Sequence, residues 1–372
     1  MSFLSWKMCQ SRPAGTLFNS KRLKMILSRQ KVNAIVLVSL SCLILYLAWE
    51  RKLKVVLIET AQKVQEQLMV VDDQSWLKGP IEADDPRLLK VIKEKFLIPP
   101  STLPYNLSPP AETKRYYPSS NASSFHFIDY NVKYFFGDQK TGIFLDSGAL
   151  EGDIFSNSLW LEKERGWTGI LVEVDPNNFR HLVLKRRKSW LSNTCIARGP
   201  YPQQVTFEFL EGPPDHGLLW VYRSNSRSID SPFFGGGDHW SKTANKTYRV
   251  MQCLPLASYF LALNVKTLDF LSLDIQGFEA DILRSIPYDK VKVRVMAVEY
   301  YYVEDDGRLS MSKVDPKLVR FMESKGYVLV DFDPEGNYIF ALKDDPQLKD
   351  KLDEKKYVKY YTMLNNRNKP KQ

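Results

Sequence analysis

The alternation of apolar and polar positions after residue 125 predicts strands that alternate with helices. Short apolar runs bounded by glycine or acidic residues predict strands at 142–145, 169–174, near Cys195, at 270–274 and 293–299, and a terminal hairpin of 327–332 and 338–342. Amphipathic stretches predict helices at 153–165, 177–187, 279–285 and 316–325. Strands separated by helices pair in parallel, so the pattern predicts a Rossmann-like α/β fold. Its sheet is mixed and mostly parallel, with helices on both faces and the antiparallel hairpin at its end.

Two weaker apolar runs interrupt this alternation. Residues 205–210 and 218–222 predict short strands, and the glycine-rich stretch 233–240 predicts a loop.

The longest apolar run of the chain lies much earlier, at residues 32–49 (VNAIVLVSLSCLILYLAW), and contains no charged side chain. At a rise of about 1.5 Å per residue, a helix of this length just crosses the hydrocarbon core of a bilayer. The alternative is a cleaved signal peptide, but Glu50, Arg51 and Lys52 follow the run in place of a small-residue cleavage site. We therefore expect one transmembrane helix before the α/β fold.

Charge is concentrated before this run. The formal net charge is +9, and residues 1–31 contain seven basic residues and no acidic one. A basic arm that binds nucleic acid is the alternative interpretation, but basic residues beside an apolar run favour a tail that stays in the cytosol. We expect no nucleic-acid partner, and a type II orientation that places the rest of the chain in the lumen.

A lumenal location agrees with two further features. Asn106, Asn121 and Asn245 begin glycosylation motifs, the first weakened by Pro109, and Cys195 and Cys253 are the only cysteines beyond the apolar run. We expect glycans on Asn121 and Asn245 and a disulfide between the two cysteines. Chance motifs and two buried free thiols are the alternatives.

Composition divides the chain into parts. Residues 99–124 are rich in proline, serine and asparagine, which is typical of a linker. The expected parts are a basic cytosolic tail (1–31), a transmembrane helix (32–49), a lumenal stem and linker (50–124), an α/β domain (125–345) and a charged tail (346–372).

Candidate chemistry follows the first predicted strand of the α/β domain, in Phe144-Leu-Asp-Ser-Gly-Ala-Leu-Glu-Gly152. Glycines there allow a tight turn and let a ligand approach a helix N-terminus. The next strand ends in Glu173-Val-Asp175, where an acidic side chain can accept hydrogen bonds from ribose hydroxyls. Together they predict a nucleoside site, and the missing third glycine argues against a nicotinamide enzyme.

These motifs resemble the FkbM-type methyltransferase domain and, within it, the protein Star family of type II membrane proteins. The resemblance also includes Cys253-Leu-Pro-Leu and Leu271-Ser-Leu-Asp-Ile-Gln-Gly-Phe-Glu279. It implies a class I methyltransferase fold, with S-adenosylmethionine bound at Asp146, Gly148, Ala149 and Gly152 and its ribose at Glu173.

The resemblance also implies that Asp274 faces the methyl group or the acceptor. The family pattern at this strand is usually Asp-x-Glu-Gly, and this chain has Gln276 in place of the glutamate. An amide cannot act as a general base near neutral pH. Glu279 and Glu299 are the remaining candidate carboxylates. The scattered histidines give no metal-ligand spacing, so we expect no metal site.

Two functions are therefore expected. By resemblance to the protein Star family, the chain would move membrane-anchored growth-factor precursors of the epidermal growth factor receptor pathway from the endoplasmic reticulum to the Golgi. Its membrane would be that of these organelles, with the endosome or plasma membrane as alternatives. The second function is an active O-methyltransferase for a glycan or a small-molecule hydroxyl.

Overall fold

The structure is a computed structural model that describes residue 49 and residues 75–109, 126–212, 219–232, 234, 242–303 and 309–352. The chain divides into two units, Met1–Lys63 and Val64–Gln372. Only Trp49 of the first unit is described, as a helical and exposed residue. All elements below belong to the second unit.

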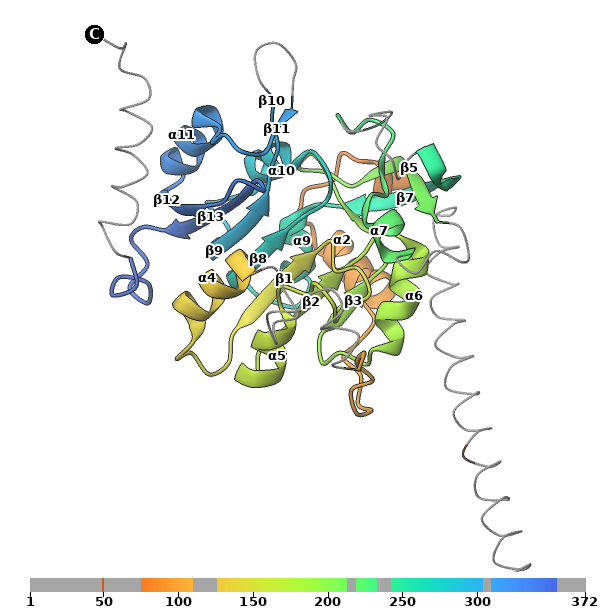
Figure 1. The fold of residues 1–372 in the computed structure, drawn as a ribbon, viewed down its shortest axis with the longest axis horizontal. Coiled ribbons are helices and arrows are strands. Elements are labelled where there is room, and N and C mark those ends of the chain that lie inside the picture. The colour runs from red at the N-terminus through yellow and green to blue at the C-terminus, as the bar shows by residue number, and fades with distance from the viewer. Residues whose placement is uncertain are drawn as a thin grey trace, which may run out of the picture. The chain divides into compact units, whose positions relative to one another are not determined.

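A seven-stranded mixed sheet forms the centre of this unit, in the order β3-β2-β1-β8-β9-β13-β12 (Figure 1). The first five strands in that order are parallel to one another, and β13 is antiparallel to both β9 and β12. The strands are β1 (Ile143–Ser147), β2 (Thr168–Val172), β3 (Trp190–Ser192), β8 (Thr267–Leu273), β9 (Lys292–Glu299), β12 (Tyr327–Phe332) and β13 (Asn337–Leu342).

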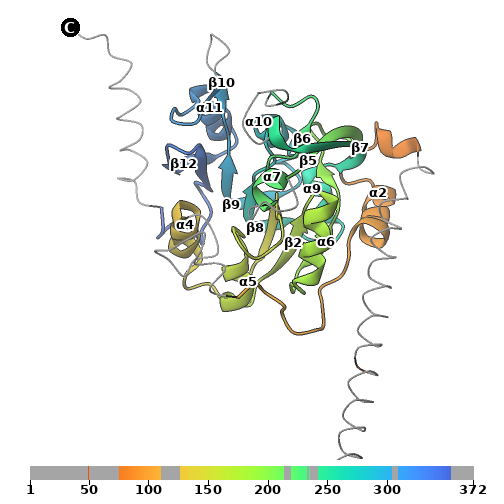
Figure 2. The same cartoon turned by 45° about the vertical axis from the view of Figure 1, so that its right-hand side comes forward.

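Helices cover both faces of the sheet (Figures 1 and 2). Consecutive strand residues point to opposite faces, so Phe144 and Leu145 belong to different apolar layers. The helices on the Phe144 face are α4 (His126–Phe136), α5 (Leu159–Arg165) and α6 (Pro176–Leu184). Those on the Leu145 face are α2 (Pro86–Val91), the π-helix η3 (Ile92–Phe96), α9 (Leu256–Leu261), α10 (Glu279–Ser285) and α11 (Pro316–Ser324).

Three of these helices begin with the same dipeptide. Asp85, Asp175 and Asp315 each cap a helix whose first residue is proline, and each side chain accepts a hydrogen bond from a backbone N–H of the first turn. Proline suits this position because its fixed φ is helical and its missing N–H would have had no partner.

A second sheet, in the order β4-β7-β5-β6, is inserted between β3 and β8. A disulfide between Cys195 and Cys253 joins β4 to β7. The elements of this insertion are β4 (Cys195–Ile196), β5 (Gln203–Glu211), α7 (Leu219–Ser224), β6 (Arg227–Ser228) and β7 (Asn245–Leu254). A separate pair, β10 (Tyr302–Val303) and β11 (Leu309–Ser310), follows β9.

The N-terminal segment 75–109 packs against this domain. It begins with a short 3-10 helix, η2 (Ser75–Lys78), and Leu88, Ile92 and Phe96 are buried in the core. This segment therefore extends the apolar layer on the Leu145 face.

The fold class predicted from the sequence was wrong in placing a transmembrane helix before the α/β domain. Within the described part of the chain, every helix falls short of the length and apolar character that a bilayer span requires. The described helices are short and turn one apolar face toward a sheet. The predicted segment 32–49 itself lies outside the described residues, apart from Trp49. The architecture that the structure supports is a mixed α/β domain.

Local differences from the predicted elements have physical causes. Residues 219–222, predicted as strand, belong to helix α7, because a short apolar run does not distinguish strand from helix. Helix α5 begins at Leu159 and not at Asp153, since residues 153–158 form turns whose side chains bond to the interior. Strand β7 was not predicted, because its first six residues are all exposed and form no apolar pattern.

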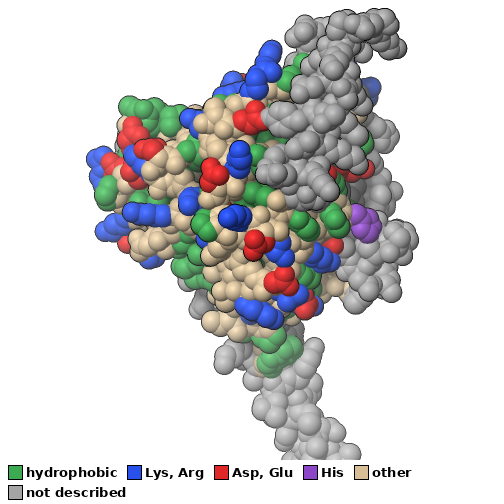
Figure 3. Space-filling view, turned by 90° about the vertical axis from the view of Figure 1, so that its left-hand side faces the viewer, with side chains coloured by type: hydrophobic (Ala, Val, Ile, Leu, Met, Phe, Trp, Pro, Cys, Tyr) green, Lys and Arg blue, Asp and Glu red, His purple; other side chains and the backbone are tan. Residues whose placement is uncertain are grey.

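On the face shown in Figure 3, Lys and Arg side chains are interspersed with Asp and Glu side chains among the described residues.

Candidate functional site

The carboxyl ends of β2, β1, β8 and β9 meet at one edge of the central sheet, beside the second sheet. A cavity of about 280 Å³ lies at this edge. In open α/β sheets, ligands bind outside the carboxyl ends of the strands. Its wall includes Gly148, Glu173, Asp274, Gln276, Phe278 and Glu299.

The turn after β1 depends on Gly148. Its φ is +87°, and a Cβ built on it would lie 1.9 Å from the backbone oxygen of Asp274. Its N–H donates to the carbonyl of Val172 at 3.0 Å. Gly148 therefore lets the turn pass between the ends of β2 and β8, where no other residue fits.

Glu173 follows β2 and is 4% exposed. Its two carboxylate oxygens each accept a backbone N–H at 2.8 Å, one from Leu150 and one from Asp175. Burial raises the pKa of Glu173 to about 8, and the negative charge of Asp175 adds to this. The carboxyl group is thus fixed in orientation and faces the cavity.

Three of the residues predicted to hold a cofactor lie behind the cavity wall. Asp146 is 2% exposed and accepts a hydrogen bond from the Ser158 hydroxyl at 2.6 Å, and burial raises its pKa. Ala149 is buried in the core. At Gly152, which has a φ of +81°, a Cβ would lie 2.1 Å from Leu182 of α6. These residues support the turn and do not line the cavity.

A buried cation also holds this turn. Arg187 is fully buried, pairs with Glu162 at 3.0 Å, and donates to the carbonyl of Gly152 and to the hydroxyl of Ser156. It links the start of β3 to the residues between β1 and α5.

Acidic residues gather at the ends of β8 and β9. The side-chain amide of Gln276 donates to Asp274 at 3.2 Å and to Glu299 at 3.2 Å. Burial raises the pKa of Glu299 well above its usual range, and the negative charge of Asp274 raises it further. Tyr301 donates to the other oxygen of Glu299 at 3.4 Å.

Glu279 lies behind this pair. It is 2% exposed and accepts the backbone N–H groups of Gly277 at 2.8 Å and Ile275 at 3.3 Å. Burial raises its pKa to about 7, although the backbone donors oppose the change. Glu279 thus closes the loop at the start of α10 and is not part of the cavity wall.

Unusual backbone conformations also concentrate here. Leu150, Phe155, Gln276 and Phe278 line the cavity and have positive φ values of 50°, 65°, 59° and 72°. Such conformations cost free energy in residues with a side chain and persist where the surroundings enforce them. The loops around the cavity are therefore held in one arrangement.

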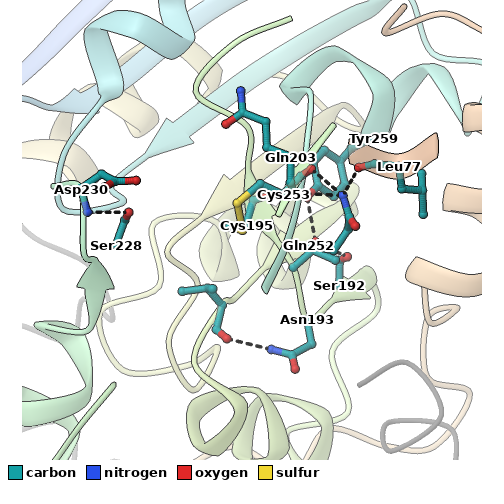
Figure 4. The surroundings of a disulfide bond; sticks show 12 residues. Leu77, Ser192, Asn193, Cys195, Gln203, Ser228, Asp230, Gln252, Cys253 and Tyr259 are labelled. Carbon is teal, nitrogen blue, oxygen red and sulfur yellow. Dashed lines mark hydrogen bonds between the residues drawn. A yellow bond between two sulfur atoms is a disulfide. The ribbon is translucent and has the colours of Figure 1, made fainter. Parts of the chain in front are cut away.

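The disulfide of Cys195 and Cys253 forms part of the opposite wall (Figure 4). Beside it, the Gln252 amide donates to the carbonyls of Leu77 and Gln203, and the Tyr259 hydroxyl donates to the carbonyl of Cys195. The disulfide and these bonds connect the N-terminal segment, the second sheet and the cavity.

Two arginines at the cavity are already paired. Arg223 contacts Glu211 at 2.7 Å, and Arg198 contacts Asp281 at 2.6 Å and lies over the Phe278 ring. The acidic groups Glu173, Asp274 and Glu299 have no comparable ion pair among the described residues.

The other predicted site residues lie elsewhere. Asn245 is exposed at the start of β7, and Asn121 lies outside the described residues. Among the residues that the structure describes, no cluster of His, Cys, Asp and Glu could hold a metal ion.

The sequence analysis named Glu299 as a candidate carboxylate but did not predict that it shares the Gln276 amide with Asp274. The available signal was its place at the end of a strand that neighbours the strand of Asp274. No motif indicated that Phe155 lines the cavity. No motif indicated that the second sheet forms part of the wall either, because that depends on how the inserted residues pack against the central sheet.

Comparison with known proteins finds one family model that matches part of the chain. Residues 146–329 match the family model of the methyltransferase FkbM domain. No curated protein matches the chain. The trafficking role expected from the protein Star family is therefore not supported by these comparisons.

Solved structures similar to this chain include methyltransferases bound to S-adenosylmethionine or S-adenosylhomocysteine. Phosphoethanolamine N-methyltransferase 2 of Haemonchus contortus, in complex with S-adenosyl-L-methionine, is 10% identical, with a TM-score of 0.25 over 57% of this chain and 36% of that chain. Phosphoethanolamine N-methyltransferase 1 of the same organism, in complex with phosphoethanolamine and S-adenosylhomocysteine, is 10% identical, with a TM-score of 0.26 over 62% of this chain and 43% of that chain. The match covers less than half of each of those chains.

Proposed function

We propose that the methyltransferase FkbM domain of residues 146–329 binds S-adenosylmethionine in the cavity at the carboxyl ends of β1, β2 and β8, and methylates a hydroxyl acceptor. The observation that carries this proposal is the meeting of the Gly148 turn, the Glu173 carboxyl group and Asp274 at one cavity.

The residues at the cavity fit such a cofactor. Each oxygen of Glu173 accepts one backbone N–H, which leaves acceptor capacity for ribose hydroxyls. Val174, Val205 and Phe207 supply apolar wall for an adenine ring. The acidic groups complement a positively charged cofactor. When bound, S-adenosylmethionine supplies an electrophilic methyl group, and its sulfur keeps the electron pair of the broken bond.

The remaining cavity residues suit an acceptor. Asp274 stands between the Glu173 side and Glu299, because β8 lies between β1 and β9. An acceptor over the ends of β8 and β9 would meet Gln276, Phe278 and Glu299.

We further propose that the domain folds in an oxidising, glycosylating compartment such as the secretory pathway. The disulfide and the exposed Asn245 support this location.

A purely transport-related role for growth-factor precursors is the competing function. It gives no reason for a cavity with two acidic groups of raised pKa, Glu173 and Glu299, which are typical of catalytic sites. We therefore favour catalysis.

The test is calorimetric titration of the full chain with S-adenosylmethionine and S-adenosylhomocysteine. Gly148 is unsuitable for mutation, because any side chain there meets Asp274. Val174→Trp fills the cavity from a half-buried wall position, and Val250→Trp places the same ring at an exposed site on β7.

Wild type and Val250→Trp should bind both ligands, and Val174→Trp should lose at least roughly tenfold in affinity, because the added ring occupies cofactor space. No binding by the folded wild-type chain would refute the proposed function. Equal affinity in all three proteins would place the ligand elsewhere.

A further inference from the structure

We propose that Glu299 is the general base that accepts the proton of the acceptor hydroxyl, and that Gln276 positions Glu299 beside Asp274. This inference rests on the proposed function and adds the group that takes up the proton released by the acceptor.

The geometry begins with one amide. The –NH₂ group of Gln276 has two hydrogens, and its nitrogen lies 3.2 Å from Asp274 Oδ1 and 3.2 Å from Glu299 Oε2. A glutamate at this position would bring a third carboxylate into contact with the other two. The amide instead donates to both carboxylates.

The backbone fixes that amide in place. Gln276, Gly277 and Phe278 have consecutive positive φ values of 59°, 122° and 72°. The Ser231 hydroxyl, from the turn after β6, donates to the carbonyl of Gln276 at 2.8 Å. Such a loop is costly to form and costly to move, so Gln276 is a rigid support.

Strand order distinguishes Glu299 from the other acids. Along the edge of the sheet, Glu173 follows β2, Asp274 follows β8 and Glu299 ends β9. Of these three carboxylates, Glu299 is therefore the farthest along the edge from the expected ribose site. Glu279 is excluded because it is turned to backbone N–H groups and is not on the cavity wall.

The charges around Glu299 suit a base. The titratable groups that face it are Asp274 from β8, Glu279 from α10 and Tyr301 from the segment after β9. Burial and then the negative charge of Asp274 raise the pKa of Glu299, so Glu299 binds a proton more tightly than an isolated carboxylate does. A carboxylate with increased proton affinity is a stronger base toward a hydroxyl.

An acceptor hydroxyl held beside Glu299 would give its proton to an ionised oxygen of Glu299 as its oxygen took the methyl group. The methyl–sulfur bond would break in the same step, with its electron pair left on the sulfur. The acceptor leaves as a neutral methyl ether, and the protonated pair returns its proton to solvent before the next turnover.

The test uses two known cofactor analogues and needs no acceptor. Sinefungin carries an amino group where the cofactor carries its methyl group, and S-adenosylhomocysteine carries nothing there. The ratio of their affinities therefore reports the charge that faces the methyl position. It should be measured by calorimetry from about pH 5 to about pH 9 for wild type, Glu299→Gln, Gln276→Asn and the exposed control Glu335→Gln.

In wild type and Glu335→Gln, the preference for sinefungin should rise roughly tenfold or more as pH increases through the raised pKa of Glu299, because the ionised carboxylate attracts the ammonium group. Glu299→Gln should remove this rise and keep binding of S-adenosylhomocysteine. Gln276→Asn, whose amide is too short to bridge the pair, should move the midpoint of the rise.

The outcomes separate the two proposals. If the folded wild type binds neither analogue, the proposed function fails and this inference with it. If both bind but Glu299→Gln keeps the wild-type pH dependence, Glu299 is not the base. Should Glu299→Gln prove unfolded by circular dichroism, Glu299→Asp, which keeps the carboxyl group but withdraws it, must shift the midpoint, and an unchanged midpoint overturns the assignment.

Discussion

At the scale of single residues, the site contains carboxyl groups whose pKa values are raised by burial. Glu173, Glu279 and Glu299 all have raised pKa values, and burial is the largest cause for each. Their hydrogen-bond donors are backbone N–H groups, an amide or a hydroxyl, and not a Lys or Arg side chain. A bound cation would therefore favour their ionised forms.

This arrangement predicts how stability depends on pH. The pKa of Glu173 is about 8 in the folded protein, above its value of 4.5 when unfolded, so the folded state binds more protons between these values. Its contribution to stability is fully present below about pH 4.5 and is lost as pH rises toward 8, at up to about 1.4 kcal/mol per pH unit. Glu173→Gln should flatten this decline.

Urea unfolding of both proteins from about pH 5 to about pH 8.5 measures the effect. Glu279 remains in the variant and should leave a smaller decline. Parallel stability curves for wild type and Glu173→Gln would show that the Glu173 carboxyl group is not protonated in the folded state.

At the scale of elements, the turn between β1 and α5 decides whether the cavity forms. Both Gly148 and Gly166 have positive φ, but a Cβ at Gly166 meets nothing within 4 Å, whereas a Cβ at Gly148 meets Asp274. Gly166→Ala should cost about 1 kcal/mol, the conformational penalty alone.

Gly148→Ala should cost several kcal/mol, because the ends of β1 and β8 must also separate. The free energy of unfolding in urea compares the two variants directly. Similar losses for both would mean that β1 and β8 do not approach as closely as described here.

The sequence anticipated the elements that bury a regular apolar face. Helix 279–285 was predicted with its observed bounds, and β9 and β13 to within one residue, because their apolar runs are short and sharply bounded. Helix α4 and strand β7 were missed. The exposed half of β7 is stabilised by pairing with β5, and local periodicity does not encode that pairing.

The sequence predicted only the parts of the site whose residues lie close together along the chain. Glu173 follows its strand at a recognisable spacing from Gly148, so its place on the cavity could be inferred. Gln276 was interpreted as a loss of an acidic group. Its bridging role depends on Glu299, which comes from another strand and becomes a neighbour only through the order of the sheet.

At the scale of the whole molecule, the disulfide between Cys195 and Cys253 joins strands β4 and β7 of the inserted sheet in the wall of the cavity. Cys195 and Cys253 are 58 residues apart in sequence, so in the chain-entropy model their bond stabilises the fold by about 4 kcal/mol. Reduction should lower the free energy of unfolding by an amount of this order, and weaken binding of S-adenosylhomocysteine.

Urea unfolding and calorimetry with and without reductant measure both effects, and Cys195→Ser/Cys253→Ser is the control that reductant should not change further. Stability and affinity that are the same in wild type before and after reduction would show that the cavity wall does not depend on the bond.

Photochemical cross-linking of radiolabelled S-adenosylmethionine to the full chain shows whether this cavity binds the cofactor. We expect label in peptides that carry cavity residues such as Glu173, Val205 or Asp274, and loss of that label in the presence of excess S-adenosylhomocysteine. Label confined to peptides remote from the cavity, or label that the competitor does not reduce, would contradict this expectation.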